Sequence, residues 1–270
     1  MGQRGGHVAH REKSTGDDAY TERAYTERLE SAVVTWRRDV SEFSQEDSGE
    51  TRRESRGDDL IEATVWMVAV HGIAGATIER IADAAHVSRG LPRHYFRRKD
   101  QLLTAAYERL AVEFVATLRQ GSAEGGADSL AALNGAIAAV FSQPHFNVDR
   151  LRAWFGFWHA SPRNRSFANV DKWVSKAQRA ILNDLLSQAA KERELEIDVE
   201  GVALGLSLLM DGAFVALAAN SYTLTTAAAE KVCRDHVQRA LGVEPQPVRV
   251  AVAGEEAGRE GGDGGRRSYP

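Results

Sequence analysis

The segment from Ala76 to Leu103, ATIERIADAAHVSRGLPRHYFRRKDQLL, most constrains how this 270-residue chain can fold. Its apolar residues recur at helical spacing through Ile78, Ile81 and Ala85, and Val87 follows at a turn. This spacing predicts two short helices that pack against each other at a steep angle. The segment is therefore expected to form a helix-turn-helix unit.

Positive charge is concentrated in this unit, although the whole chain has a net charge of -4. Between residues 77 and 101, six Lys or Arg side chains stand against three acidic ones. Ser88 is a suitable N-cap for the second helix, whose first turns would project Arg89 and Arg93 outward. A guanidinium group can bridge the two major-groove acceptors of guanine. The pattern predicts that Arg89 and Arg93 read DNA bases.

These residues resemble the TetR family of one-component bacterial repressors. The resemblance rests on Thr77, Ile81, Ala82, Ala85, Val87, Ser88, Gly90, Tyr95, Phe96, Lys99, Leu102 and Leu103. It implies that Thr77 caps the first helix, that Gly90 allows close approach of DNA, and that phosphates are held by His94, Tyr95 and Lys99. The complete set of predicted DNA contacts is Thr77, Ser88, Arg89, Gly90, Arg93, His94, Tyr95 and Lys99.

Pro92 is the one residue of the second helix that does not suit a helix beginning at Ser88. It lies four residues after the predicted cap, where its missing amide would have made the first intrahelical hydrogen bond. We expect a slightly distorted first turn in an otherwise intact helix.

Four regions are expected along the chain: a polar extension (1–55), the helix-turn-helix domain (56–103), a ligand-binding and dimerisation domain (104–243) and a tail (244–270). The extension and the tail are expected to be disordered because they bury too little apolar surface. The extension still contains one marginal amphipathic helix, whose spaced apolar residues are Leu29, Val33, Trp36 and Val40. It carries ten basic and fourteen acidic residues up to Asp59, so a groove-binding arm is not favoured.

The third region is expected to be helical throughout, which makes the fold all-α. Helices are predicted at 129–141, 148–160, 165–191, 199–221 and 225–241, preceded by a connecting helix that begins at Lys99. The single cysteine, Cys233, excludes an internal disulfide and fits a reducing cytoplasm. The N-terminal residues show no apolar core typical of a secretion signal.

Two stretches of this region carry chemical information. Trp154 and Trp158 lie four residues apart and share one helix face, which is compatible with plain core packing or with an aromatic cage for a quaternary ammonium ion. Asp211 interrupts an apolar helix, where a carboxylate needs compensation. Its partner is expected to be a base such as Arg152, backbone groups beside Gly212, or a positively charged ligand.

The stretches AWFGFWHASPRNRSFANV and LSLLMDGAFVALAA resemble the C-terminal domain of BetI-type repressors, the TetR branch that responds to choline. The resemblance covers roughly residues 149–241, with Phe214 and Val215 standing where that group commonly has a Trp. It implies a small-molecule effector, either a cationic or quaternary amine or another small hydrophobic ligand. The expected ligand-binding residues are Trp154, Phe157, Trp158, Asp211 and Phe214.

Assembly and alternative functions complete the prediction. Small residues of the 199–221 helix, Gly205 and Gly212 among them, allow a close two-fold contact, and the 165–191 helix offers a second amphipathic face. A homodimer on a palindromic operator is therefore expected. No metal, cofactor or catalytic residue is expected, because the eight histidines lack metal-binding spacing and no phosphate loop is present. An all-α enzyme and a membrane-associated protein stay open as alternatives, although Asp211 disfavours a membrane span.

Overall fold

The computed structural model describes residues 23–34, 49–143, 146–219 and 224–245, with the side chains of 49–55 left out. Within these ranges the regular structure is helical, as expected for an all-α protein. In chain order the elements are a helix at 23–34, α2 (Gly49–Gly75), α3 (Ile78–Ala84), α4 (Pro92–Tyr95), α5 (Lys99–Glu124), α6 (Ser129–Phe141), α7 (Val148–Ala160), η1 (Ser161–Arg163), α8 (Arg165–Glu192), α9 (Val199–Ala218) and α10 (Thr226–Ala240).

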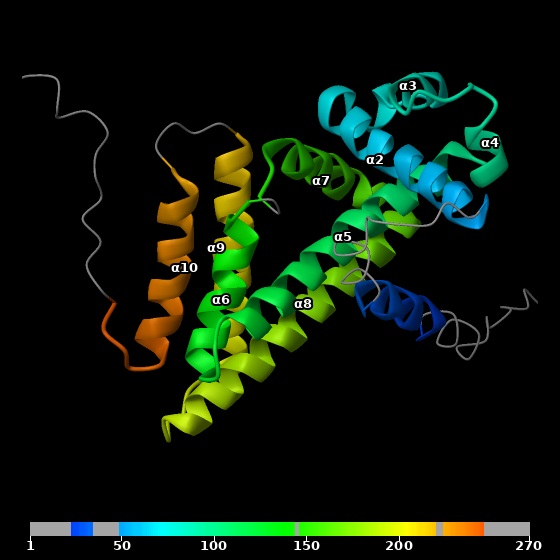
Figure 1. Ribbon diagram of the computed structural model, residues 1–270. Coiled ribbons are helices and arrows are strands. Elements are labelled where there is room, and N and C mark those ends of the chain that lie inside the picture. The colour runs from blue at the N-terminus through cyan, green and yellow to red at the C-terminus, as the bar shows by residue number, and fades with distance from the viewer. Residues whose placement is uncertain (1–22, 35–48, 144–145, 220–223, 246–270) are drawn as a thin grey trace, which may run out of the picture.

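The helices form two groups that share α5. Helices α2, α3 and α4 lie together at one end of the molecule, and α5 runs from them into a bundle with α6, α8, α9 and α10 (Figure 1). Helix α7 lies between the two groups and packs against α2 and α9. The small unit and the bundle are therefore connected by one continuous helix and by α7.

The bundle helices begin where the sequence predicted them because polar side chains cap their first turns. Each capping oxygen accepts a backbone N–H of the following helix. The caps of α6, α7, α8, α9 and α10 are Asp128, Asn147, Asn164, Asp198 and Thr225. Helices α6 and α7 have the predicted bounds, and α9 ends three residues earlier than predicted.

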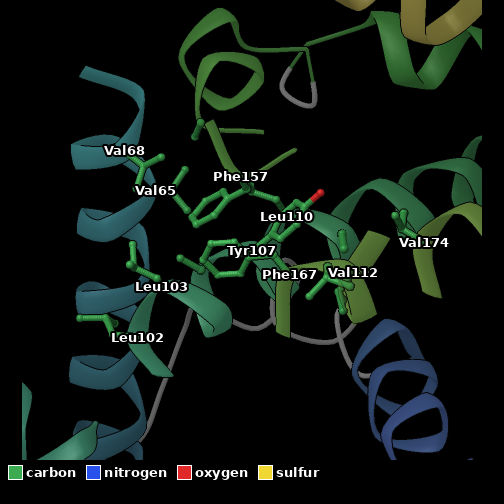
Figure 2. Packing of buried hydrophobic residues seen from close by; sticks show 14 of the residues in the cluster. Val65, Val68, Leu102, Leu103, Tyr107, Leu110, Val112, Phe157, Phe167 and Val174 are labelled. Atoms are coloured by element: carbon green, nitrogen blue, oxygen red, sulfur yellow. The ribbon is translucent and has the colours of Figure 1, made fainter. Parts of the chain in front are cut away.

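The core consists of two hydrophobic clusters. One joins α2, α5, α7 and α8 around Tyr107, whose ring stacks on that of Phe157 at a centroid separation of 4.8 Å (Figure 2). The other joins α5, α6, α8, α9 and α10 around Leu133, Leu186 and Leu206, each of which is fully buried. Because α5 and α8 contribute to both clusters, the two parts of the molecule have a continuous interior.

The N-terminal region differs from the predicted disordered extension. Residues 23–34 form a helix, and Leu29 and Val33 are buried in the first cluster. Its Arg28 and Glu30 form ion pairs at 2.6 Å with residues of α5. The helical patch was predicted, but its burial was not, because its docking site is built from residues about 80 positions away. Trp36 and Val40 lie outside the described residues.

The predicted domain boundaries also fall inside helices. Helix α2 begins at Gly49, so the boundary at residues 55 and 56 lies within it, and α5 continues unbroken through the boundary at 103 and 104. Gly72 ends the regular part of α2 with a left-handed φ of 67°. Glycine adopts this conformation without steric cost, and α2 is kinked at this residue.

Helix α9 is long and apolar enough to cross a membrane, with a mean hydropathy of 1.9 over its most apolar window. Only 17% of that window is buried within the chain. Leu204, Leu208 and Val215 are all about half exposed, and Val232 of α10 is too. Helices α9 and α10 thus present an apolar face that nothing in the described chain covers.

Helices α5 and α6 approach each other closely through glycines. A Cβ atom added to Gly135 would lie 2.6 Å from Gly125 Cα, and one added to Gly121 would lie 2.6 Å from Gly135 O. Both contacts involve backbone, which cannot move aside as a flexible side chain can. The hairpin of α5 and α6 therefore requires glycine at these crossings.

We predict that Gly135→Ala lowers the free energy of unfolding by about 1–3 kcal/mol, because the overpacking outweighs the better helix propensity of alanine. The matched control is Gly90→Ala in the exposed turn before α4, where an added Cβ meets nothing within 4 Å. That variant should be as stable as the wild type or up to about 1 kcal/mol more stable. Urea denaturation of both variants measures the difference, and equal stability would contradict the close contact.

Candidate functional site

The helix-turn-helix unit is held by one side-chain cap and one left-handed residue. The Thr77 side chain accepts a hydrogen bond from Arg80 N at 3.3 Å, which confirms the predicted cap of α3. After α3, His86 adopts a φ of 53°, and Val87 N donates to Ala82 O at 3.0 Å. This tight turn directs the chain into α4. The left-handed conformation of His86 was not predicted, since residues other than glycine rarely adopt it.

The second helix begins later than predicted. It comprises Pro92–Tyr95 only, and its N-cap is Leu91 without a side-chain hydrogen bond. Residues 88–91 form a turn closed by Leu91 N donating to Ser88 O at 2.9 Å. Pro92 accounts for the difference, because a residue without an N–H is suited to the first helical position and not to a helix interior. The prediction that Ser88 caps this helix is wrong.

The turn and the short helix nevertheless expose most of the predicted DNA contacts. Ser88, Arg89, Gly90, Arg93 and His94 are all exposed. Arg89 lies 3.6 Å from Asp83 in an exposed pair, and a Cβ added to Gly90 would meet nothing within 4 Å. These five exposed contacts thus lie within residues 88–94 of the unit.

Two predicted phosphate contacts are partly engaged within the protein. Lys99 Nζ donates to Ile73 O at 2.9 Å, so the side chain binds a carbonyl at the end of α2. Tyr95 is half-buried and packs against the first cluster. Sequence reasoning missed the bond of Lys99, because Ile73 is 26 residues away and only folding brings the two together. Contact of either residue with DNA stays a prediction.

The bundle contains a cavity of about 810 Å³. Helices α5, α7, α8 and α9 line it, and α5 contributes residues from Leu110 to Glu124, which is about 21 Å of helix. Its lining includes the predicted Trp154, Trp158, Asp211 and Phe214, together with Glu113, Phe114, Arg150, Phe155, Asp171 and Gln178. Four of the five predicted ligand-binding residues therefore line one space.

Phe157 is the predicted ligand-binding residue that does not line this cavity. Its side chain is fully buried and packs against the rings of Tyr107 and Phe167 (Figure 2). It is one residue before Trp158, and neighbouring residues of a helix do not face the same side, so it points away from the side that Trp158 occupies. The aromatic residues of α7 therefore have two roles: Phe157 packs in the core, and Trp154 and Trp158 line the cavity.

Asp211 has no hydrogen bond or ion pair within the described part of the chain, and burial raises its pKa to about 6. The base suggested from the sequence, Arg152, instead pairs with Asp149 at 3.1 Å. No kink occurs in α9 at Gly212. The two internal partners considered for Asp211 are therefore both excluded, and its carboxylate lines the cavity without compensation.

Aromatic rings surround the same space. The Phe114 ring lies 5.8 Å from Trp154 and 6.3 Å from Phe214, measured between centroids. Trp158 is 42% exposed and stacks on Phe155 at 6.0 Å. Aromatic faces attract cations through their quadrupoles. Rings and an uncompensated carboxylate together make a wall that suits an organic cation.

Ion pairs connect the cavity with the helix-turn-helix unit. Arg150 of α7 binds Glu113 of α5 at the cavity wall and Glu62 of α2, the latter at 2.8 Å. Burial lowers the pKa of Arg150, but the two carboxylates outweigh this effect and raise it above its ordinary value. Arg109 of α5 extends the network to Glu62 and Asp58. These residues were not predicted, because their charges are unremarkable on separate amphipathic helices.

A second carboxylate of the cavity was also missed. Asp171 of α8 accepts a hydrogen bond from the Tyr107 hydroxyl, and Ser161 is a further hydrogen-bond partner. Burial raises its pKa, although both hydrogen bonds act in the opposite direction. Neither partner carries a positive charge. Asp171 therefore keeps its negative charge uncompensated when it is ionised.

Comparison with known proteins agrees with both parts of this arrangement. Residues 60–106 match the family of bacterial regulatory proteins of the tetR type, and residues 129–242 match the C-terminal domain of BetI-type transcriptional repressors. The chain belongs to the TetR family. Its C-terminal domain is of the BetI type, and the protein is a transcriptional regulator and not an enzyme.

Curated relatives and solved structures extend the comparison. The regulator is 28% identical over 190 residues to the HTH-type transcriptional regulator BetI of Burkholderia mallei, covering 70% of this chain and 95% of the relative. A transcriptional regulator from Pseudomonas aeruginosa PAO1 superimposes with a TM-score of 0.65 at 28% identity, covering 75% and 96% of the two chains. A regulator from Saccharomonospora viridis, solved in complex with choline, shares the fold with a TM-score of 0.59 at 18% identity over 68% and 96%.

We predict that the carboxylate of Asp211 destabilises the unliganded fold at neutral pH. Its pKa in the folded protein, about 6, lies above the 3.8 of an exposed carboxyl, so the folded state binds the proton more tightly. The resulting stabilisation is complete below about pH 4 and is lost as the pH rises through 6. Near pH 7.5, Asp211→Asn should therefore raise the free energy of unfolding by about 1–2 kcal/mol.

Denaturant unfolding near pH 7.5 and near pH 4 measures this effect, and the advantage of the variant should vanish at the acidic pH. The matched control is Asp149→Asn, which removes an exposed carboxylate that is paired with Arg152. An Asp211→Asn variant that is less stable than the wild type at neutral pH would show that the carboxylate has an internal partner.

Proposed function

We propose that this regulator binds a palindromic operator as a homodimer and releases it when an organic cation enters the cavity of the bundle. The observation that carries the proposal is the position of Asp211, a partly buried carboxylate that has no partner among the described residues and lines an aromatic cavity. A regulator of this kind acts in the cytoplasm, where its DNA is.

DNA binding is assigned to the exposed turn and to the helix that follows it. Arg89 and Arg93 read base edges in the major groove, Gly90 allows the DNA surface to come close, and Thr77, Ser88, His94, Tyr95 and Lys99 contact the backbone. Support comes from the exposure of residues 88–90, 93 and 94 in a unit that matches the tetR family over residues 60–106. Phosphate contacts fix the register, and the arginines supply specificity.

The homodimer forms through α9 and α10. Leu204, Leu208 and Val215 lie on one side of α9, and Val232 exposes half of its surface on α10. Two such faces related by a two-fold axis would bury each other and form a four-helix contact. The same axis places two recognition helices at successive major grooves, about 34 Å apart, which requires a palindromic operator.

The effector is assigned to the class of organic cations. The Asp211 carboxylate supplies the charge, and Trp154, Trp158 and Phe214 supply the apolar wall. The choline bound to the Saccharomonospora viridis regulator, which has the same fold, supports this class. The alternative, a neutral hydrophobic ligand, would fill the cavity but leave Asp211 uncompensated.

Release of the operator follows from the ion pairs of Arg150. This residue contacts Glu113 at the cavity wall and Glu62 on α2, so it joins the effector site to the DNA-binding unit. A cation close to Glu113 would compete with Arg150 for that carboxylate and alter the position of α2. An effector with higher affinity for the altered state lowers operator affinity by its differential binding energy.

We predict that Arg93→Ala weakens binding to the natural operator by about 1–3 kcal/mol and relaxes the base preference at one position of each half-site. The control is Arg179→Ala, an exposed arginine of α8 that donates to Ser175 O and lies outside the helix-turn-helix unit. Fluorescence anisotropy with the operator and with single-base variants measures both effects. An Arg93→Ala variant with unchanged preference at every position would contradict base contact by this residue.

We predict that Leu208→Asp converts the regulator to a monomer, because a charge on the α9 face cannot be buried against a second copy. Operator affinity should fall on the order of 100-fold as the second half-site contact is lost. Sedimentation velocity gives the mass, and Leu195→Asp is the control, since Leu195 is similarly apolar and exposed but lies after α8. Retention of the dimer in the Leu208→Asp variant would place the interface elsewhere.

A further inference from the structure

The cavity contains more negative charge than a single ammonium group would neutralise. Four carboxylates line it, and the basic residue among its described lining, Arg150, is already paired with Glu113 and Glu62. Glu124 lies at the exposed end of α5. Within the interior this leaves two carboxylates without a cation, Asp171 and Asp211.

These two carboxylates lie at different levels of the bundle. Gln178 Nε2 lies 3.7 Å from Met210 Sδ, which places the residue preceding Asp211 level with Gln178. Asp171 is seven residues before Gln178 on α8, a rise of about 10 Å. Helices α8 and α9 also diverge in this direction (Figure 1).

Aromatic rings occupy the space between the two levels. The Tyr107 hydroxyl binds Asp171, and its ring lies 5.6 Å from Trp154. Trp154 is followed by Phe114 at 5.8 Å and by Phe214 at 6.3 Å, and Phe214 is one helical turn after Asp211. A row of rings thus leads from one carboxylate to the other, which suits an alkyl chain with a positive charge at each end.

The shape of the cavity agrees with an elongated ligand. Its lining on α5 extends over about four turns, and 810 Å³ is a volume for a drug-sized molecule. A compact ammonium ion would occupy one end only. An anionic ligand such as a fatty acid is disfavoured, because it would meet two uncompensated carboxylates and an arginine that is already paired.

From this arrangement we propose that the effector site binds an elongated dication, with one positive group at Asp211 and the other at Asp171. The inference rests on the proposed cationic effector and specifies it further. In the dication complex, Asp211 and Asp171 each hold one charge, while Trp154 and Phe114 contact the connecting chain.

The test compares hexamethonium, which has two trimethylammonium groups, with hexyltrimethylammonium, which has the same chain and one charge. Calorimetry on the full chain at low salt should show that hexamethonium binds at least about tenfold more tightly, as expected for one additional charge pair. Decamethonium and tetramethylammonium then report the preferred length. Equal or weaker binding of hexamethonium would overturn the proposal.

Variants assign the two ends. Asp171→Asn should lower the affinity for hexamethonium to about that for hexyltrimethylammonium and leave the affinity for hexyltrimethylammonium unchanged. Asp211→Asn should weaken the binding of both ligands. Tyr107→Phe removes a hydrogen bond of Asp171 but keeps its charge, so the preference for hexamethonium should persist in that variant. The assignment of the second charge site to Asp171 would be contradicted if Glu124→Gln lost the preference for hexamethonium while Asp171→Asn kept it.

Operator release distinguishes this inference from the proposed function. If hexyltrimethylammonium binds and causes release of operator DNA while hexamethonium binds no more tightly, the proposal of a cationic effector is supported and the second charge site is refuted. If none of the cations binds, both proposals fail at the cavity, although DNA binding by the exposed turn is still measured independently by the Arg93→Ala comparison.

Discussion

The structure depends on α5, because this single helix belongs to both functional parts of the regulator. Its first turn closes the helix-turn-helix unit, where Lys99 binds a carbonyl at the end of α2, and its later turns line the cavity. Residues of α5 are buried in both core clusters. A displacement of one end therefore strains packing at the other, since close-packed interiors transmit small shifts and do not absorb them.

A second connection runs through charge. Arg150 joins a carboxylate of the cavity wall to one on α2, and Arg109 continues the network along α2. Such a cluster is sensitive to an additional cation, because Glu62 is shared by two arginines and Arg150 by two carboxylates. The uncompensated carboxylate of Asp211 lowers the free energy of unfolding, and binding of a cation beside it would raise that free energy again.

Much of the fold was predictable from the sequence because local chemistry determines it. Helix bounds such as 129–141 and 148–160 followed from apolar periodicity, and polar caps such as Asp128 and Asn147 explain why these helices begin there. The second helix of the DNA-binding unit was misplaced because Ser88 was preferred as a cap over Pro92 as a first helical residue. Burial of the helix at 23–34 was missed because its partners on α5 are distant in sequence.

The sequence by itself determined the TetR-type fold, the DNA-binding turn with its arginines, and the presence of an unusual carboxylate at Asp211, since spacing, caps and charge are local properties. Only the tertiary structure decided which groups face one another. Phe157 lies in the core, whereas Trp154 lines the cavity. Asp211 does not pair with Arg152, the partner suggested from the sequence, and Asp171 lines the same cavity as Asp211. Distances between separate helices arise from packing, which residue spacing along one helix does not encode.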